Sequence, residues 1–323
     1  MKLLLVGPYP PPHGGVSVHV AGLKDRADRA GVPCRVLNTE RSAPNSKKYV
    51  RNRTAAGFIA SLARYSFSGW TIDVHTNGHN TKSWIVALLC ALAGVAGRKP
   101  GQLMIHSGMT PEYLAGSAAR RRLARVTCRL YGRITCVNPR IQTVIESLGV
   151  PAQRIQVAFA GAETIADSSV LVRDEPFLSI GAHAEWLRTH QPLLVATGGA
   201  GPEYGVDLLL NALDSLKSRF PDIGCVVMGV NETVPRDAVR MVGDIPHNEC
   251  LCLISKANVF VRPTFADGDS ISVREALALK IPVIASDCAQ RPAGTVLFET
   301  GNSRDLVERL ECVLMQCSTR FAQ

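Results

Sequence analysis

The sequence lacks several short motifs that would assign a chemistry at once. Neither the GxGxxG dinucleotide fingerprint nor the P-loop GxxxxGK(S/T) occurs in it, so dinucleotide dehydrogenases and P-loop kinases drop in rank. Ten cysteines are present, yet none belongs to a CxxC pair, and we interpret them as reduced thiols that serve as small core residues. Aromatic residues make up only 6% and are not interleaved with the basic runs, which argues against nucleic acid as a partner.

A hydrophobic run of membrane-spanning length is also lacking. The apolar start, Lys2–Val6, is too short for a signal peptide and is followed at once by a proline-rich segment. The longest candidate span, Trp84–Gly97, has 14 residues, whereas a bilayer requires about 20. We therefore expect a cytoplasmic protein in which this segment is a buried helix.

Charge of both signs is present but is divided unevenly along the chain. Residues 1–165 hold 22 Lys and Arg against 7 Asp and Glu, whereas residues 166–323 hold 14 against 20. The basic half suits an anionic partner, such as an anionic membrane surface or a phosphorylated acceptor. An uneven solvated surface is the alternative.

Apolar strand-like runs alternate with helical stretches along the chain, which is typical of parallel α/β sheets. At 323 residues the chain is long enough for two domains, and the order strand, glycine-rich loop, helix begins twice. We predict an α/β fold of two Rossmann-like doubly wound domains, residues 1–165 and 166–323, facing a central cleft, with a crossover within 161–190. Ligands of such sheets bind at the carboxyl ends of the strands. The predicted elements include one helix over Tyr113–Tyr131, a loop over Arg41–Thr54 and a helix over Ser272–Leu279.

Two glycines, Gly14 and Gly15, stand between the first strand and the helix predicted from Val16. A glycine pair lets the backbone approach a ligand, and the helix N-terminus supplies N–H groups and the positive end of the helix dipole. This arrangement suits a diphosphate, and a tight strand-to-helix turn is the structural alternative. A second glycine-rich loop, which contains Gly199, follows the first strand of the second half.

The most informative stretch runs from Arg262 to Glu275 (RPTFADGDSISVRE). Asp267 and Glu275 lie on either side of a loop that turns into a helix, where Asp267 could hold sugar hydroxyls and Glu275 a ribose. Backbone amides at the helix start suit a phosphate. The alternative is a capping box, Ser272-x-x-Glu275, which satisfies helix amides without any ligand. The candidates for contact with a phosphate or with another part of the ligand in this stretch are Arg262, Gly268, Asp269, Ser270, Ser272 and Arg274.

Together these segments resemble the donor-site signature of retaining glycosyltransferase family 4. The pair Asp267-x7-Glu275, followed by the strand Pro282–Ser286 (PVIAS), is similar to the family's carboxylate motif, and Gly7–Val16 (GPYPPPHGGV) resembles its N-terminal glycine loop. The two motifs stand at opposite ends of the chain in the expected order. The resemblance implies a GT-B fold and transfer of a sugar from a nucleotide donor with retention of configuration, without a metal or other cofactor.

Carried over to this chain, the resemblance implies roles for single residues. The glycine pair would lie near the donor diphosphate, Glu275 would bind the ribose, and Asp267 would face the transferred sugar. His106, at the end of a first-half strand, would shield charge at the reacting sugar, and His75, also at a strand end, is its rival. The first half would bind the acceptor and the second half the nucleotide-sugar donor.

The sequence departs from the family pattern in the loop and the helix of the second half. The family usually carries an Arg and a Lys that neutralise the diphosphate, and Gly199 and Tyr204 occupy these positions here. Because the charge of the leaving diphosphate grows in the transition state, another cation must replace them, and Arg262 and Arg274 are the candidates. The first carboxylate of the motif is an Asp instead of a Glu, and Lys280 replaces the usual Gly after the helix.

A run of arginines continues through the helix predicted over 113–131. Arg122, Arg125, Arg129 and Arg133 recur at spacings of three and four, which places them on one helical face beside Arg121. Such a face suits peripheral contact with an anionic membrane or a lipid-linked acceptor, and a solvated helix face is the alternative.

No residue of the sequence identifies the nucleotide or the sugar of the donor, or the acceptor. UDP is favoured over GDP by its frequency in the family, and synthesis of a cell-surface polysaccharide or glycoconjugate is the expected context. One alternative is a nucleotide-sugar epimerase or hydrolase on the same scaffold, which would consume donor with no acceptor present. The other is a degenerate GT-B subunit that binds without turnover, motivated by the missing Arg and Lys.

Overall fold

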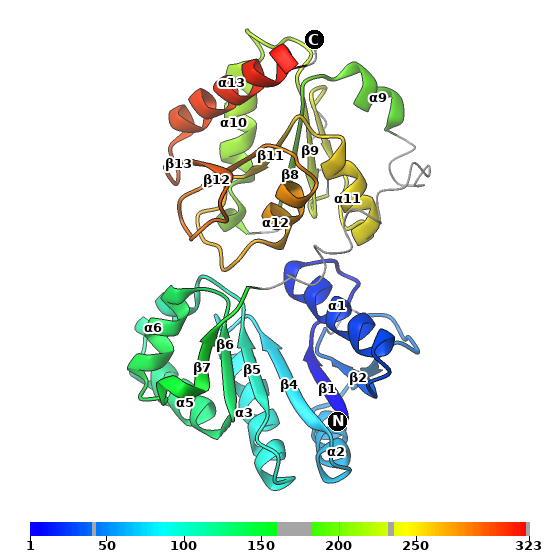
Figure 1. Cartoon of the computed structure of the whole chain (residues 1–323), viewed down its shortest axis with the longest axis vertical. Coiled ribbons are helices and arrows are strands. Elements are labelled where there is room, and N and C mark those ends of the chain that lie inside the picture. The colour runs from blue at the N-terminus through cyan, green and yellow to red at the C-terminus, as the bar shows by residue number, and fades with distance from the viewer. Residues whose placement is uncertain (41–42, 160–182, 200, 232–235, 321–323) are drawn as a thin grey trace. The chain divides into compact units, whose positions relative to one another are not determined.

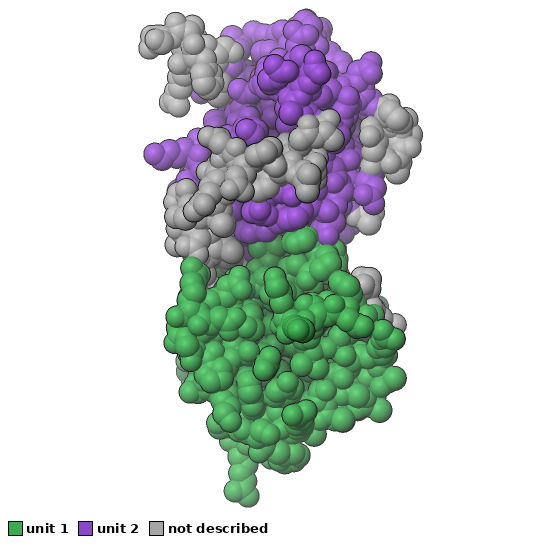
Figure 2. Space-filling view, turned by 90° about the vertical axis from the view of Figure 1, so that its right-hand side faces the viewer, with its two compact units in different colours: residues 1–163 green, residues 164–323 purple. Residues whose placement is uncertain are grey.

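The structure is a computed structural model that describes residues 1–40, 43–159, 183–199, 201–231 and 236–320. Each half of the chain has its own parallel sheet flanked by helices (Figure 1), which confirms the predicted α/β architecture. Figure 2 distinguishes the two compact units, Met1–Glu163 and Thr164–Gln323. The boundary predicted at residues 165 and 166, and most of the predicted crossover, lie outside the described residues.

The sheet of the first unit consists of β1 (Leu3–Gly7), β2 (Cys34–Asn38), β3 (Val50–Arg51), β4 (Thr71–Thr76), β5 (Gln102–Ile105), β6 (Arg133–Cys136) and β7 (Ile155–Val157). The strand order is β3-β2-β1-β4-β5-β6-β7, so the direction of winding reverses between β1 and β4. Leu4, Leu5 and Val6 of β1 are fully buried, as expected for a parallel strand that is covered on both faces.

The helices of the first unit are α1 (Gly15–Arg29), α2 (Ala55–Phe67), α3 (Thr81–Ala96), α4 (Thr110–Ala115), α5 (Ala118–Leu130) and α6 (Pro139–Ser147). Side-chain caps set several of their starts. Thr54, Asn80 and Asn138 precede α2, α3 and α6, and each side chain accepts a hydrogen bond from a backbone amide of the first turn.

Three predictions for the first unit are wrong. The helix predicted over 113–131 is two helices, because Ser117 is extended, with φ at −164°, and begins α5 anew. Helix α5 ends at Leu130, so Arg133 belongs to β6 and not to the predicted arginine face. The segment predicted as a loop over 41–54 contains the short edge strand β3.

The sheet of the second unit consists of β8 (Leu193–Thr197), β9 (Gly224–Met228), β10 (Val239–Met241), β11 (Val259–Arg262), β12 (Val283–Ser286) and β13 (Thr295–Phe298). The strand order is β10-β9-β8-β11-β12-β13, so winding reverses between β8 and β11. The strands run parallel. The last residues of three neighbouring strands, Thr197, Arg262 and Ser286, therefore lie at one edge.

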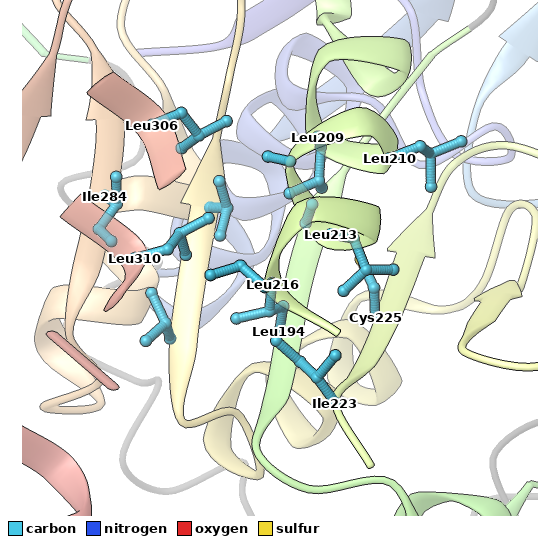
Figure 3. Packing of buried hydrophobic residues seen from close by; sticks show 14 of the residues in the cluster. Leu194, Leu209, Leu210, Leu213, Leu216, Ile223, Cys225, Ile284, Leu306 and Leu310 are labelled. Carbon is cyan, nitrogen blue, oxygen red and sulfur yellow. The ribbon is translucent and has the colours of Figure 1, made fainter. Parts of the chain in front are cut away.

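The helices of the second unit are α9 (Ala184–Thr189), α10 (Val206–Leu216), α11 (His247–Ser255), α12 (Ile271–Ala278) and α13 (Ser303–Arg320), with a 3-10 turn η2 (Pro202–Tyr204). Alternate strand residues face opposite layers. Leu194 packs with Leu213 of α10 and Leu310 of α13 (Figure 3), whereas Leu193 packs with Val273 of α12 on the other face. Each buried leucine contributes about 1.5–3 kcal/mol, so the strand ends rest on a rigid platform.

The segment predicted as a buried helix, 84–97, forms most of α3, which ends one residue earlier, at Ala96. Trp84 and Cys90 are fully buried there, whereas Ile85 and Leu92 are 48% and 49% exposed. Within the described part of the chain, no helix is both long enough and apolar enough to cross a membrane.

Candidate functional site

A buried cluster of two arginines and one carboxylate lies at the carboxyl ends of β11 and β12. Asp267 Oδ2 accepts hydrogen bonds from Arg262 Nε at 3.0 Å and from Arg291 Nη1 at 2.8 Å. Burial alone would raise the pKa of the Asp267 carboxyl, but the two guanidinium groups outweigh it and lower the pKa to about 2. Two cations and one anion give these three side chains together a net positive charge.

Arg262 joins this cluster to the glycine-rich loop after β8. Its Nη1 donates to the backbone oxygen of Thr197 at 3.2 Å and to Thr197 Oγ1 at 2.7 Å. Its guanidinium carbon lies 5.5 Å from the centre of the Tyr204 ring. The same ring fills the space beside Gly199, where an added Cβ would lie 2.3 Å from it. A positive charge therefore stands next to the two positions at which the sequence lacks the family's cations.

The start of α12 differs from the predicted capping box. Ser270 is the N-cap, and its side chain accepts a hydrogen bond from the Val273 amide. Ser272 lies inside the helix, with its hydroxyl 3.1 Å from that of Ser270 and 3.2 Å from that of Thr197. The alternative in which Ser272 caps the helix is therefore wrong, because the N-cap lies two residues earlier, at Ser270.

Two further phosphate-contact candidates have partners within the loop. The Gly268 amide donates to Asp267 Oδ1 at 3.0 Å, so the prediction of an open amide at this residue is wrong. Arg274 Nε donates to both carboxylate oxygens of Asp269, at 2.9 and 3.0 Å, and the Asp269 side chain is only 3% exposed. Arg262, and not Arg274, is thus the predicted cation that lies beside Tyr204.

The second carboxylate of the motif, Glu275, is buried and has a partner from another helix. Its Oε1 lies 2.6 Å from His247 Nε2, in the first residue of α11. His247 thereby fixes the orientation of the carboxylate. Sequence reasoning missed both His247 and Arg291. No motif of the sequence marks either residue: His247 is the first residue of α11, and Arg291 lies five residues after the end of β12.

In the first unit, Gly14 and Gly15 begin α1 in open surroundings. Neither has a positive φ, and a Cβ added at either residue would meet no atom within 4 Å. The strand-to-helix turn itself therefore does not require glycine here. Close approach of a ligand to the backbone would still favour glycine at both positions. The first turn of α1 also carries no acidic side chain that would repel an anion.

His106 and its rival His75 lie side by side, and a third histidine joins them. His75 Nδ1 is 3.2 Å from His106 Nε2, and the ring of His19, on α1, lies 5.2 and 5.3 Å from the two rings. Burial lowers the pKa of His75 to about 4 and, with the nearby histidines, lowers that of His106 well below its usual value. It also lowers the pKa of His19 to about 3, so all three imidazoles are neutral near pH 7.

Comparison with known proteins identifies a family match within the second unit. Residues 191–316 match the family described as Glycosyl transferases group 1. The second unit contains a group 1 glycosyltransferase domain. Over 308 residues the chain is 24% identical to a phosphatidyl-myo-inositol mannosyltransferase of Propionibacterium freudenreichii subsp. shermanii, a match that covers 89% of this chain and 77% of that protein.

Solved structures extend the likeness to both units. Anabaena HepE in complex with UDP and glucose matches with a TM-score of 0.74 at 15% identity, over 98% of this chain and 91% of that one. Sucrose-phosphate synthase from Thermosynechococcus elongatus matches with a TM-score of 0.71 at 16% identity, over the same shares. The predicted GT-B fold is confirmed, and with the group 1 domain and the mannosyltransferase relative it makes the chain a glycosyltransferase.

Proposed function

We propose that this glycosyltransferase takes a sugar from a UDP-sugar and transfers it, with retention of configuration, to a glycan or lipid-linked acceptor. The observation that supports it best is the Arg262–Asp267–Arg291 cluster beside the point where winding reverses between β8 and β11. Doubly wound sheets bind their ligands at that point. A net positive charge there suits a diphosphate, and the structural neighbour HepE is known in complexes with UDP and with UDP-glucose.

The cluster supplies the electrostatic requirement of the reaction. As the bond from the sugar to the diphosphate breaks, negative charge grows on the leaving group, and donors already in place stabilise it without reorganisation. Asp267 holds both guanidinium groups at the strand ends before the donor arrives. Arg262 and Arg291 then replace the missing Arg and Lys of the family's loop.

The remaining site residues keep the roles that the resemblance implies. Glu275, oriented by His247, binds the ribose of the donor. Gly14 and Gly15 approach the diphosphate, and His106 contacts the transferred sugar. The transfer needs no metal under this proposal, and its product belongs to a cell-surface polysaccharide or glycoconjugate.

The acceptor side of the proposal rests on the first unit. Arg122, Arg125 and Arg129 are exposed on α5, and Val126 between them is 53% exposed. A helix face that mixes arginines with an apolar side chain suits the surface of an anionic membrane. The relative whose name specifies a phosphatidylinositol lipid supports an acceptor that is held at such a surface. A protein bound to the cytoplasmic face of the membrane would meet this acceptor directly.

Calorimetric titration with UDP, GDP, ADP and uridine tests the donor site. We expect selective binding of UDP, and a loss of tenfold or more in UDP affinity in Arg262→Gln and in Arg291→Gln, because a hydrogen bond to a charged group contributes about 1.5–3 kcal/mol. Uridine carries no diphosphate, so these two variants should bind it as the wild type does. Glu275→Gln should weaken UDP and uridine alike.

The exposed Arg304, on α13, provides the matched control, since Arg304→Gln removes the same charge at a side chain that is 89% exposed. If Arg304→Gln weakened UDP binding as much as Arg262→Gln does, the cluster would have no special role. Absence of binding to every nucleotide would favour the degenerate subunit. Consumption of UDP-sugar with no acceptor present would favour the epimerase or hydrolase.

A further inference from the structure

A carboxylate and two of the buried histidines form one line of side chains in the first unit. His75 Nδ1 lies 3.2 Å from His106 Nε2, and the other ring nitrogen of His75, Nε2, lies 3.7 Å from Asp73 Oδ1. Asp73 and His75 are two residues apart on β4 and share one face of the sheet, and His106 directly follows the neighbouring strand β5. The line therefore runs toward the carboxyl edge of the sheet, where doubly wound sheets bind their ligands.

The two histidines of this line are uncharged, whereas its carboxylate is charged. Burial lowers the pKa of His75 to about 4 and, with the nearby histidines, lowers that of His106 well below its usual value. Burial raises the pKa of Asp73 to about 6, so this carboxyl group is still mostly ionised near pH 7. Each imidazole therefore has one nitrogen with a proton and one without, and a negative charge stands at one end of the line.

The contact between the two rings allows two arrangements of their protons. In the first, His106 Nε2–H donates to His75 Nδ1, and His75 carries its own proton on Nε2, toward Asp73. In the second, His75 Nδ1–H donates to His106 Nε2, and the unprotonated Nε2 of His75 faces the carboxylate. The first arrangement places a proton, and the second a lone pair, opposite the negative charge. The low polarity of the protein interior strengthens this difference, so the charge of Asp73 favours the first arrangement.

The surroundings of His75 Nε2 favour the same arrangement. This nitrogen is buried and has no hydrogen-bond partner among the residues that the structure describes, and a buried N–H requires an acceptor. Asp73 Oδ1, at 3.7 Å, comes within hydrogen-bond distance after a shift of about 1 Å. A carboxylate that accepts from one nitrogen of a histidine holds that ring in one tautomer.

We propose that Asp73 and His75 are positioning residues that fix the tautomer of His106 and leave its Nδ1 unprotonated toward the ligand. This role rests on the proposed function, in which His106 contacts the transferred sugar. An unprotonated Nδ1 accepts a hydrogen bond from a sugar hydroxyl, and its lone pair stabilises the positive charge that develops on the sugar ring as the bond to the diphosphate breaks. The opposite tautomer would direct an N–H dipole at that charge and slow the transfer.

Long-range ¹H–¹⁵N correlation spectra of the full chain, labelled with ¹⁵N in histidine, test this role by showing which ring nitrogen carries each proton. Near neutral pH we expect His75 and His106 both to be protonated on Nε2. Asp73→Asn should raise the ratio of the Nδ1–H form to the Nε2–H form of His106 by about tenfold or more, because an asparagine amide donates to His75 Nε2 and reverses the line. Asp25→Asn, at an exposed residue of α1, is the matched control and should leave both tautomers unchanged.

A proton on Nδ1 of either histidine in the wild type, or an unchanged His106 in Asp73→Asn, would overturn the proposal. If Asp73→Asn does not fold, the wild-type protein still decides, because the one-bond coupling of the proton shared by the two rings shows whether His106 or His75 donates it. Titration of the wild type with UDP is run in parallel. The expected tautomers without UDP binding would refute the proposed donor alone, whereas UDP binding with His106 protonated on Nδ1 would refute this role alone.

Discussion

Asp267 illustrates how much a single residue's role depends on partners that sequence does not reveal. The motif places this carboxylate toward a sugar, yet in the structure both of its oxygens accept hydrogen bonds from the protein itself. Its arginine partners are 12% and 2% exposed, so the carboxylate compensates two buried cations. Asp267 therefore holds Arg262 and Arg291 in place even when no ligand is bound.

Asp267→Asn keeps the shape of the side chain and removes its charge, so the two arginines lose their anion. We expect the free energy of unfolding to fall by about 3–5 kcal/mol at pH 7, measured by urea denaturation. Asp222→Asn, at an exposed residue of the same unit, should change it by less than about 0.5 kcal/mol.

The pH dependence of this difference follows from the lowered pKa of Asp267. The group has a pKa of about 2 when folded and of about 4 when unfolded, so its ionisation stabilises the folded state above pH 4 by about 2.6 kcal/mol. That contribution is lost as the pH falls from about 4 to 2. The gap between wild type and Asp267→Asn should therefore be constant at neutral pH and narrow in acid. A gap that stayed constant down to pH 2.5 would show that charge is not its cause.

At the scale of the element, the end of α12 explains a departure from the family pattern. Lys280 has a left-handed φ of 61°. Its amide donates to the Leu277 carbonyl, and the Ile281 amide donates to the Ala276 carbonyl, which is the hydrogen-bond pattern of a Schellman motif. Glycine is favoured at that position because any Cβ is strained there.

Lys280→Gly should stabilise the protein, because the release of left-handed strain, about 1–2 kcal/mol, exceeds the entropic cost of glycine, about 0.5–1 kcal/mol. Lys256 supplies the opposite case: it caps α11 with φ at −91°, so Lys256→Gly should destabilise. Melting temperatures of the two variants and the wild type check this pair. A fall in both variants would mean that Lys280 makes a contact worth more than its strain.

Elements and motifs were predictable from sequence to different degrees, for identifiable reasons. The strand predicted over Pro282–Ser286 is present as β12 and begins one residue later, at Val283, because its consecutive apolar residues fit a strand that is buried on both faces. The edge strands β10 and β13 were not predicted, since their short runs of partly exposed residues carry no such signal. Helix α4 was joined to α5 in the prediction, because the extended backbone of Ser117 is invisible in its side-chain pattern.

The residues of the candidate site also differ in how far the sequence predicts them. Asp267 and Glu275 are close in sequence, so they could be matched to the carboxylate motif of the family that the chain resembles, which implies a paired role. Arg291, His247 and His19 reach their partners from other elements, 24 residues or more away. Only the strand order and the helix packing bring them into contact, and a single sequence does not state either.

At the scale of the whole molecule, the two units differ in the sign of their net charge. Residues 1–165 hold 22 basic against 7 acidic side chains, and residues 166–323 hold 14 against 20. The exposed arginines of α5 lie on the basic unit, and its neighbour α3 exposes Ile85, Leu92 and Val95 by 48%, 49% and 44%. A protein divided in this way should bind an anionic surface through its first unit only.

We therefore expect the protein to sediment with vesicles that contain anionic lipid at low salt, and to be released as salt screens the contact. Each arginine at such a surface contributes about 1 kcal/mol, so Arg122→Glu, Arg125→Glu and Arg129→Glu combined should weaken binding by a hundredfold or more. The matched control reverses the same charge on the same unit away from α5, at the exposed residues Lys47, Lys48 and Arg53. Equal loss in the two triple variants would show that net charge, and not the face of α5, holds the protein to the membrane. Binding that persists in the α5 variant and at high salt would instead place the contact on the apolar side chains of α3.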